Sequence, residues 1–135
     1  MPKEFVPESE GFHPFGELIG LTFSKSEKGY SECVLEVKEK LLNPHKVVHG
    51  GVISTMAGTG MGGALYPYLD EHELCAAIEI KTVYFIAVAS GILTCKTKLI
   101  HKSKRIATLE SEIEADGCLV AKAIGTYSIF RVNGD

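Results

Sequence analysis

The chain has 135 residues, of which 45% are hydrophobic and 23% are charged, a balance typical of one globular domain with its own core. A formal net charge of −3 excludes a basic surface that would draw the chain to nucleic acid or to an anionic membrane, and no apolar run is long enough to span a bilayer. The first 15 residues lack the apolar core of a signal peptide, so we expect a cytoplasmic protein with no nucleic-acid partner and no membrane partner.

The N-terminal half predicts an arm, two strands and a helix. Residues 1–16 carry three prolines and indicate an N-terminal arm, either loosely structured or a short packed helix, ahead of a single domain over residues 17–131. Strands are predicted over residues 17–23 and 30–37, with a polar turn between them. A linker follows, and a glycine-studded helix is predicted over about residues 50–66, where Pro67 ends it.

The C-terminal half predicts four antiparallel strands, over residues 75–88, 91–101, 105–115 and 118–130. A turn centred on Ser103 predicts that Lys96 lies across from Glu110, which would be a favourable pair of opposite charges. Asp116-Gly117 is typical of a tight hairpin turn between the last two strands.

One helix and one long antiparallel sheet predict an α+β fold, in which a curved sheet of about five to six strands wraps the helix. Four glycines lie inside the helix, at positions 58, 60, 62 and 63, and each costs up to about 1 kcal/mol relative to alanine. Close approach of the strands to the helix would offset that cost. The spacing of residues 58–63 also matches G-x-G-x-x-G, but a dinucleotide site needs that pattern at a strand-to-helix turn, so we reject this interpretation.

His49, Gly50 and Gly51 stand where this helix begins. A helix N-terminus presents backbone N–H groups without intrahelical acceptors and a partial positive charge. The N–H groups of Gly50 and Gly51 could therefore form an oxyanion hole for a carbonyl or a thioester. The alternative is that the glycines only make a tight turn into the helix, and spacing alone favours it, since so short a pattern has many chance matches.

The four cysteines, at positions 33, 75, 95 and 118, form no C-x-x-C pair. His72 and Cys75 are the only closely spaced histidine and cysteine, whereas a structural metal site usually needs two such pairs. We therefore expect no metal and no cofactor. Cys95 and Cys118 stand in strand-like runs, where a buried thiol is expected.

Several segments together resemble one family. "LNPHKVVHGGVISTMAGTGMGGAL", "IEIKTVYF", "HKSKR" and "GCLVAKAIGTY" are similar, in the same order, to the phenylacetate-degradation (PaaI) group of hotdog-fold acyl-CoA thioesterases, from about residue 41 to residue 130. The resemblance implies a hotdog fold and a homodimer or homotetramer whose active sites lie between subunits. It also implies that the chain hydrolyses the thioester of an acyl-CoA to a free acid and CoA.

The resemblance assigns roles to residues at the start of the helix. Asn43 and His49 match residues that position the acyl group or water, and Gly50 matches the glycine whose N–H polarises the thioester carbonyl. The alternatives are a plain turn residue for Asn43 and a helix-entry residue for His49. Further candidate contacts to substrate are Gly51, Thr55 and Thr59.

Gly58 marks a departure from the family. It stands nine residues after the histidine, where the family carries the carboxylate that acts as general base or nucleophile, and Ala77 falls about where some members have a hydroxyl residue. Neither residue can take a proton, and losing a positioned base typically costs about 10²–10⁴-fold in rate. The alternative function is therefore an acyl-CoA-binding protein with little or no turnover. A hotdog dehydratase would need a protonatable residue at the substrate, and no candidate is better placed than His49.

The basic segment "HKSKR", residues 101–105, corresponds to the family region that contacts the nucleotide phosphates of CoA. The resemblance therefore implies that CoA contacts Lys102, Ser103, Lys104 and Arg105, with the arginine able to bind a phosphate through two hydrogen bonds. The alternative is a solvated hairpin tip, which is common for lysines.

Overall fold

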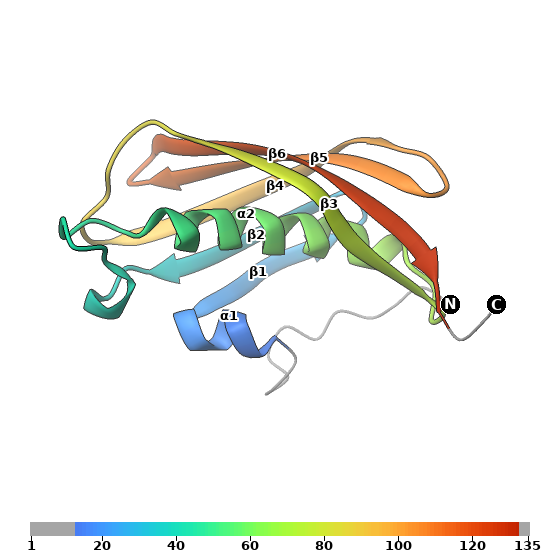
Figure 1. Cartoon of the computed structure of the whole chain (residues 1–135), viewed down its shortest axis with the longest axis horizontal. Helices are drawn as coiled ribbons and strands as arrows, with labels where there is room; N and C mark the ends of the chain where they lie inside the picture. Colours follow the sequence, from blue (N-terminus) through green and yellow to red (C-terminus); the bar gives the residue numbers. More distant parts are fainter. Residues whose placement is uncertain (1–12, 133–135) are drawn as a thin grey trace.

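The computed structural model describes residues 13–132, which form one six-stranded sheet and one long helix (Figure 1). The elements follow in the order α1 (Pro14–Ile19), β1 (Leu21–Glu27), β2 (Tyr30–Glu36), η1 (Glu39–Leu41), α2 (Gly50–Leu65), η2 (Tyr66–Tyr68), β3 (Glu73–Tyr84), β4 (Ile92–Lys102), β5 (Ile106–Ala115) and β6 (Cys118–Arg131). The short elements η1 and η2 are 3₁₀ turns.

The sheet is antiparallel throughout, and its strand order is β1-β2-β4-β5-β6-β3. It curves around α2, so that β1 and β2 lie on one side of the helix in Figure 1 and β3 and β6 on the other. Most of the buried side chains belong to α2 or to the sheet. The predicted α+β hotdog fold is confirmed.

The start of the domain differs from the prediction. The strand expected over residues 17–23 is wrong at its beginning, because α1 occupies residues 14–19. Pro14 stands in the first helical turn, where its missing N–H is harmless, and Nδ1 of His13 accepts a hydrogen bond from the Gly16 N–H at 2.7 Å. Gly20 ends the helix in the left-handed region, with a φ of 80°. Of the predicted N-terminal arm, residues 1–12 lie outside the described residues.

The two C-terminal hairpins test the predicted turns. Lys96 lies across from Glu112, so the predicted pair with Glu110 is wrong. The turn lies further along the chain than expected, because the loop spans residues 103–105 and Lys102 pairs with Ala107, and a bulge near residue 100 shifts the register back by one residue. The second hairpin turn is confirmed, because Asp116 and Gly117 both have positive φ angles, 51° and 79°, as a type I′ turn requires.

Helix α2 contacts hydroxyl groups of the sheet as well as apolar side chains. Oγ of Ser31 donates to the Gly60 carbonyl at 2.6 Å, and Oγ of Ser111 donates to the Ala57 carbonyl at 3.2 Å. Oγ1 of Thr97 lies 2.6 Å from the Ser111 oxygen, and all three hydroxyl side chains are buried. The sheet therefore holds the helix by hydrogen bonds to its backbone as well as by apolar packing.

Two helix glycines allow this close contact. A Cβ at Gly60 would lie 2.5 Å from Oγ1 of Thr97, and a Cβ at Gly63 would overlap the ring of Phe23. At these two positions the strands approach the helix as closely as the sequence predicted.

The outer strand β3 carries exposed apolar side chains, including Leu74, Ile78 and Val83, and Ile78 is 60% exposed.

Cys95 is buried as expected, but the expectation for Cys118 is wrong: it is exposed because it directly follows the tight turn. Within residues 13–132, no helix has both the length and the apolar character that crossing a membrane requires.

Candidate active site

The loop that leads into α2 places Asn43 in a turn. Its side-chain oxygen accepts hydrogen bonds from the backbone N–H groups of His45, at 2.8 Å, and Val47, at 3.4 Å. The backbone N–H of His49 donates to the Leu41 carbonyl at 2.9 Å, which fixes where the helix begins. The oxygen of Asn43 thus shapes the loop that delivers His49.

His49 is the N-cap residue of α2. Its Nδ1 atom accepts a hydrogen bond from the Gly51 N–H at 2.8 Å. A neutral imidazole that accepts at Nδ1 carries its proton on Nε2, so His49 presents a donor at its other ring nitrogen. In this arrangement Nε2 of His49 can donate a hydrogen bond to an oxygen atom. The Gly51 N–H is already used by the cap, which leaves the Gly50 N–H as the leading backbone donor for an oxyanion.

Gly50 lies against a tyrosine from the end of β3. Oη of Tyr84 donates to the Gly50 carbonyl at 3.0 Å and lies 2.8 Å from Oγ of Ser54. A hollow of about 270 Å³ adjoins Gly50, and we call it the Gly50 pocket. It is lined mainly by apolar side chains, from Val47, Val48, Ile53 and residues 84–88.

Gly58 lies in a second hollow, of about 390 Å³, which we call the Gly58 pocket. Ala77 lines the same pocket, so the two positions where the family carries reactive groups do lie together. Oη of Tyr127 donates to the Gly58 carbonyl at 2.7 Å. Burial, and to a smaller extent nearby Cys75, raises the pKa of the Tyr127 phenol, so it stays protonated and acts as a donor. The remaining lining residues are His13, Phe23, Thr59, Gly62, Gly63, Tyr66, Cys75 and Ala76.

The Gly50 and Gly58 pockets are separate. Gly50 and Gly58 are eight residues apart on one helix, which corresponds to about 12 Å along its axis. No lining residue is shared between the two pockets. Within one chain the oxyanion donor and the place of the family carboxylate therefore do not meet.

The two candidate threonines have different surroundings. Oγ1 of Thr55 donates to the Gly51 carbonyl at 2.8 Å, one turn back along the helix. Thr59 lines the Gly58 pocket. Of the two, Thr59 is placed to contact a molecule in that pocket.

The basic side chains at the tip of the β4–β5 hairpin lie in two different surroundings. Lys104 and Arg105 line a hollow of about 720 Å³ together with Arg131 from the end of β6, and we call it the basic pocket. Nζ of Lys102 lies 5.3 Å from the centre of the Tyr68 ring, within the range of a cation–π contact. Ser103 closes the loop, since its Oγ accepts from the Ile106 N–H at 3.3 Å.

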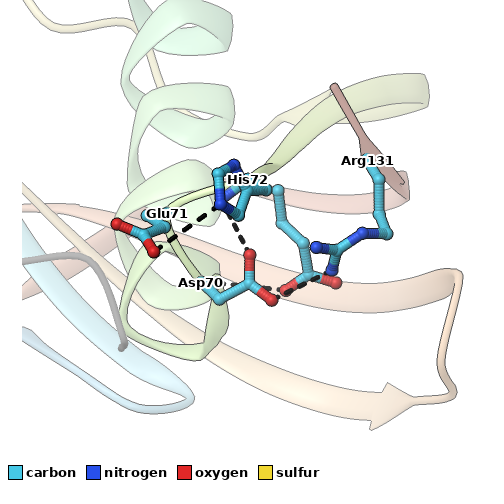
Figure 2. Close-up of polar contacts among 5 residues, drawn as sticks. Asp70, Glu71, His72 and Arg131 are labelled. Carbon is cyan, nitrogen blue, oxygen red and sulfur yellow. Dashed lines mark hydrogen bonds and ion pairs between the residues drawn. The ribbon is translucent and has the colours of Figure 1, made fainter. Parts of the chain in front are cut away.

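Arg131 is held by the turn that precedes β3, as Figure 2 shows. Its Nη1 atom lies 3.1 Å from Oδ2 of Asp70. The other carboxylate oxygen of Asp70 accepts from the His72 backbone N–H at 2.8 Å. This backbone hydrogen bond, with a smaller contribution from Arg131, lowers the pKa of the Asp70 carboxyl. The ion pair fixes the guanidinium at one side of the basic pocket.

Sequence patterns did not point to Tyr127 or to Arg131. Tyr127 reaches Gly58 because β6 pairs with β3, with Tyr127 directly across from Ala77. Arg131 reaches the β4–β5 loop from the far end of the sheet's longest strand. Their positions depend on the pairing of strands that are distant in sequence, and no local sequence pattern reveals that pairing. In the described part of the chain, no three histidine, cysteine, aspartate or glutamate side chains lie together in a way that could hold a metal ion.

The sequence pattern of the thioesterase superfamily matches residues 45–122, which include His49, Gly50 and Gly58. Together with the fold and the site at the start of α2, this match shows that the chain belongs to the thioesterase superfamily. The resemblance to its PaaI group is also confirmed by the relatives and solved structures that follow.

A protein from Saccharolobus solfataricus, provisionally named an esterase, is 30% identical over 130 residues, which is 96% of this chain and 83% of that protein. The 1,4-dihydroxy-2-naphthoyl-CoA hydrolase of Listeria monocytogenes is 28% identical over 72% of this chain and 79% of its own length. A mutant of the phenylacetic acid degradation protein PaaI from Thermus thermophilus superposes with a TM-score of 0.80 and 26% identity, over 86% of this chain and 98% of that chain. A thioesterase from Haemophilus influenzae shares the fold with a TM-score of 0.88, at 21% identity, over 97% and 94% of the two chains.

Proposed function

We propose that this chain binds an acyl-CoA and hydrolyses its thioester to a free acid and CoA. The observation that carries the proposal is the start of α2, where the Gly50 N–H stands at the positive end of a 16-residue helix. Nε2 of His49, which carries the ring proton, is the second donor. A thioester oxygen gains negative charge as water attacks the carbonyl carbon, and donors placed there stabilise that charge. Similarity to a relative named as a CoA-thioester hydrolase supports this substrate class.

We further propose that a second copy of the chain completes the site. A thioester carbonyl and its attacking group must come within about 3–3.5 Å, whereas Gly50 and Gly58 lie about 12 Å apart along one helix. Helices from two copies could bring these positions together. The outer strand β3 supports such an assembly, because it is 12 residues long, has apolar exposed side chains, and pairs on one side only, with β6, among the described residues. The expected assembly is a homodimer or a homotetramer.

We propose that the basic pocket binds the nucleotide phosphates of CoA. Lys104, Arg105 and Arg131 line it, and guanidinium groups bind phosphate through paired hydrogen bonds. Ser103 precedes Lys104 on the loop, and Lys102 is the last residue of β4. The cytoplasmic location stays a prediction from the sequence.

The second candidate function is acyl-CoA binding with little turnover. The specific observation in its favour is the lining of the Gly58 pocket, which holds no carboxylate. Gly58 and Ala77 cannot take a proton, and Tyr127 has a raised pKa and stays protonated. Water in this pocket would lack the carboxylate base that the family places here.

The two functions are separated by measuring binding and turnover on the same protein. Release of the CoA thiol from acetyl-, hexanoyl-, palmitoyl- and benzoyl-CoA reports turnover, and calorimetry with CoA reports binding. The thioesterase proposal predicts thiol release above that of buffer. Binding without release would favour the binding protein, and no binding and no release would exclude both functions.

The oxyanion donor can be removed without losing the helix. Gly50 is the first helical residue, where proline is favoured, and His49 has the extended backbone that a following proline requires (φ −61°, ψ 132°). Gly50→Pro deletes one N–H group, whereas the matched control Gly50→Ala adds a Cβ near the Tyr84 ring and keeps the N–H. We expect Gly50→Pro to lower hydrolysis about 10²-fold or more relative to Gly50→Ala. Equal rates in the two variants would remove Gly50 from the proposed site.

A further inference from the structure

Two of the four glycines inside α2 are not required by packing. A Cβ at Gly62 would meet no atom within 4 Å. A Cβ at Gly58 would meet only the end of the Ile80 side chain, at 3.0 Å, and Oη of Tyr127, at 3.5 Å. The other two, Gly60 and Gly63, are pressed against the sheet. Glycine weakens a helix interior, so Gly58 and Gly62 lower its stability without allowing closer packing in return.

Gly58 and Gly62 open onto the same space. They are four residues apart, so they lie one above the other on one face of α2. Both line the Gly58 pocket, whose aromatic wall is formed by Phe23, Tyr66 and Tyr127. Its volume of about 390 Å³ lies within the range of roughly 300–1,000 Å³ that is typical of small-molecule sites. Side chains at either position would project into this pocket and narrow it.

We propose that Gly62, together with Gly58, determines which acyl groups the chain accepts, by leaving the Gly58 pocket wide enough for an acyl group that is branched or cyclic near its carbonyl. The inference rests on the proposed function, in which a second copy brings the Gly50 donor of one chain to the Gly58 pocket of the other. The acyl part of the substrate then lies in that pocket. A ring can fill the width of the pocket and contact the aromatic wall, whereas a linear chain with the same number of carbons would leave part of that width empty. The absence of side chains at Gly58 and Gly62 is thus the source of the selectivity for a cyclic over a linear acyl group.

The test compares two hydrolysis-resistant thioethers that have equal numbers of carbons, S-cyclohexylmethyl-CoA and S-heptyl-CoA. Calorimetry gives their dissociation constants for the unmodified chain, for Gly62→Leu, and for the matched control Gly62→Ala, which also removes a glycine but adds little volume. We expect the unmodified chain to bind the cyclic thioether more tightly. Gly62→Leu should weaken that binding by about 10-fold or more while changing the linear thioether by less than about 3-fold.

The outcomes separate this inference from the function on which it rests. Gly62→Ala should melt at a higher temperature than the unmodified chain, because its Cβ enters open space in a helix. If Gly62→Leu does not fold, Gly62→Met replaces it, since its unbranched side chain adapts to the cavity. An unchanged preference for the cyclic thioether in the folded bulky variant would overturn the role of Gly62 and leave acyl-CoA binding intact. Failure of CoA and both thioethers to bind the unmodified chain would overturn the proposed function and this inference with it.

Discussion

Placing a carboxylate at the centre of α2 tests whether the missing family base limits turnover. In Gly58→Asp the new Cβ would contact Cδ1 of Ile80 at 3.0 Å, the far end of a flexible side chain that can rotate away. The Tyr127 hydroxyl lies 3.5 Å from the same Cβ, and it can donate to the carboxylate only by giving up its hydrogen bond to the Gly58 carbonyl. The substitution also removes a glycine from the helix interior, which favours the helix by roughly a few tenths of a kcal/mol.

The expected gain follows from the value of a positioned acid–base group, about 10²–10⁴-fold in rate. Each factor of ten is about 1.4 kcal/mol, so the introduced carboxylate should lower the barrier by about 3–6 kcal/mol. We expect Gly58→Asp to release CoA thiol from acyl-CoA at least about 10²-fold faster than the unmodified chain. Gly58→Asn is the matched control, because it has the same shape without a base. Only the aspartate variant should gain rate as pH rises through the pKa of a carboxyl.

One result would refute this reasoning. If the unmodified chain hydrolyses acyl-CoA at ordinary enzyme rates, about 1–10³ s⁻¹, and Gly58→Asp is slower, another group must handle the proton. Thr59, which lines the pocket, and then Thr55 would be the first to substitute.

Three further predictions concern assembly, the nucleotide and acid stability. The unmodified chain should sediment as an oligomer at micromolar concentration, and Ile78→Lys, which puts a charge on the outer strand, should dissociate it; a stable unmodified monomer would contradict the β3 interface. Arg105→Ala should weaken CoA binding about 10-fold at low salt and make it less salt-dependent, and an unchanged affinity would place the phosphates elsewhere. The folded-state pKa of Asp70 lies below the ordinary value of 3.8, so its ionised form stabilises the fold above that pH and the stabilisation is lost as pH falls through the folded-state pKa. Asp70→Asn should therefore lower the melting temperature at pH 7 and lose that difference in stronger acid, and a difference that does not depend on pH would exclude this origin.

The fold could be predicted largely because its elements carry strong local patterns. Alternation of apolar and polar residues indicated the strands, and Asp116-Gly117 indicated the last hairpin turn. The wrong predictions concern the start of the domain and the register of β4 against β5, where a local structural feature outweighed the pattern of apolar and polar residues. Capping by His13 and Pro14 made a helix of residues expected in a strand, and a turn that lies further along the chain than expected moved Lys96 away from Glu110.

Only the part of the candidate site that is formed by residues close together in the sequence could be predicted. His49 and Gly50 are neighbours in sequence, and the helix start between them follows from the loop that precedes it. Tyr127 and Arg131 come to their pockets through strand pairing, and no local pattern encodes the register of β6 against β3. The width of the Gly58 pocket depends in the same way on which strands meet the helix.

The hydrogen bonds between the sheet and α2 bear on how the chain acquires its structure. A 16-residue helix with four interior glycines would be largely disordered as an isolated peptide. Its carbonyls accept from Ser31, on a strand that precedes the helix, and from Ser111, on a strand that follows it by more than 40 residues. Contacts between residues far apart in the sequence require a long loop to close, which costs conformational entropy. Proteins rich in such contacts fold slowly. The helix therefore depends on the surrounding sheet for its stability, and we expect it to form together with that sheet.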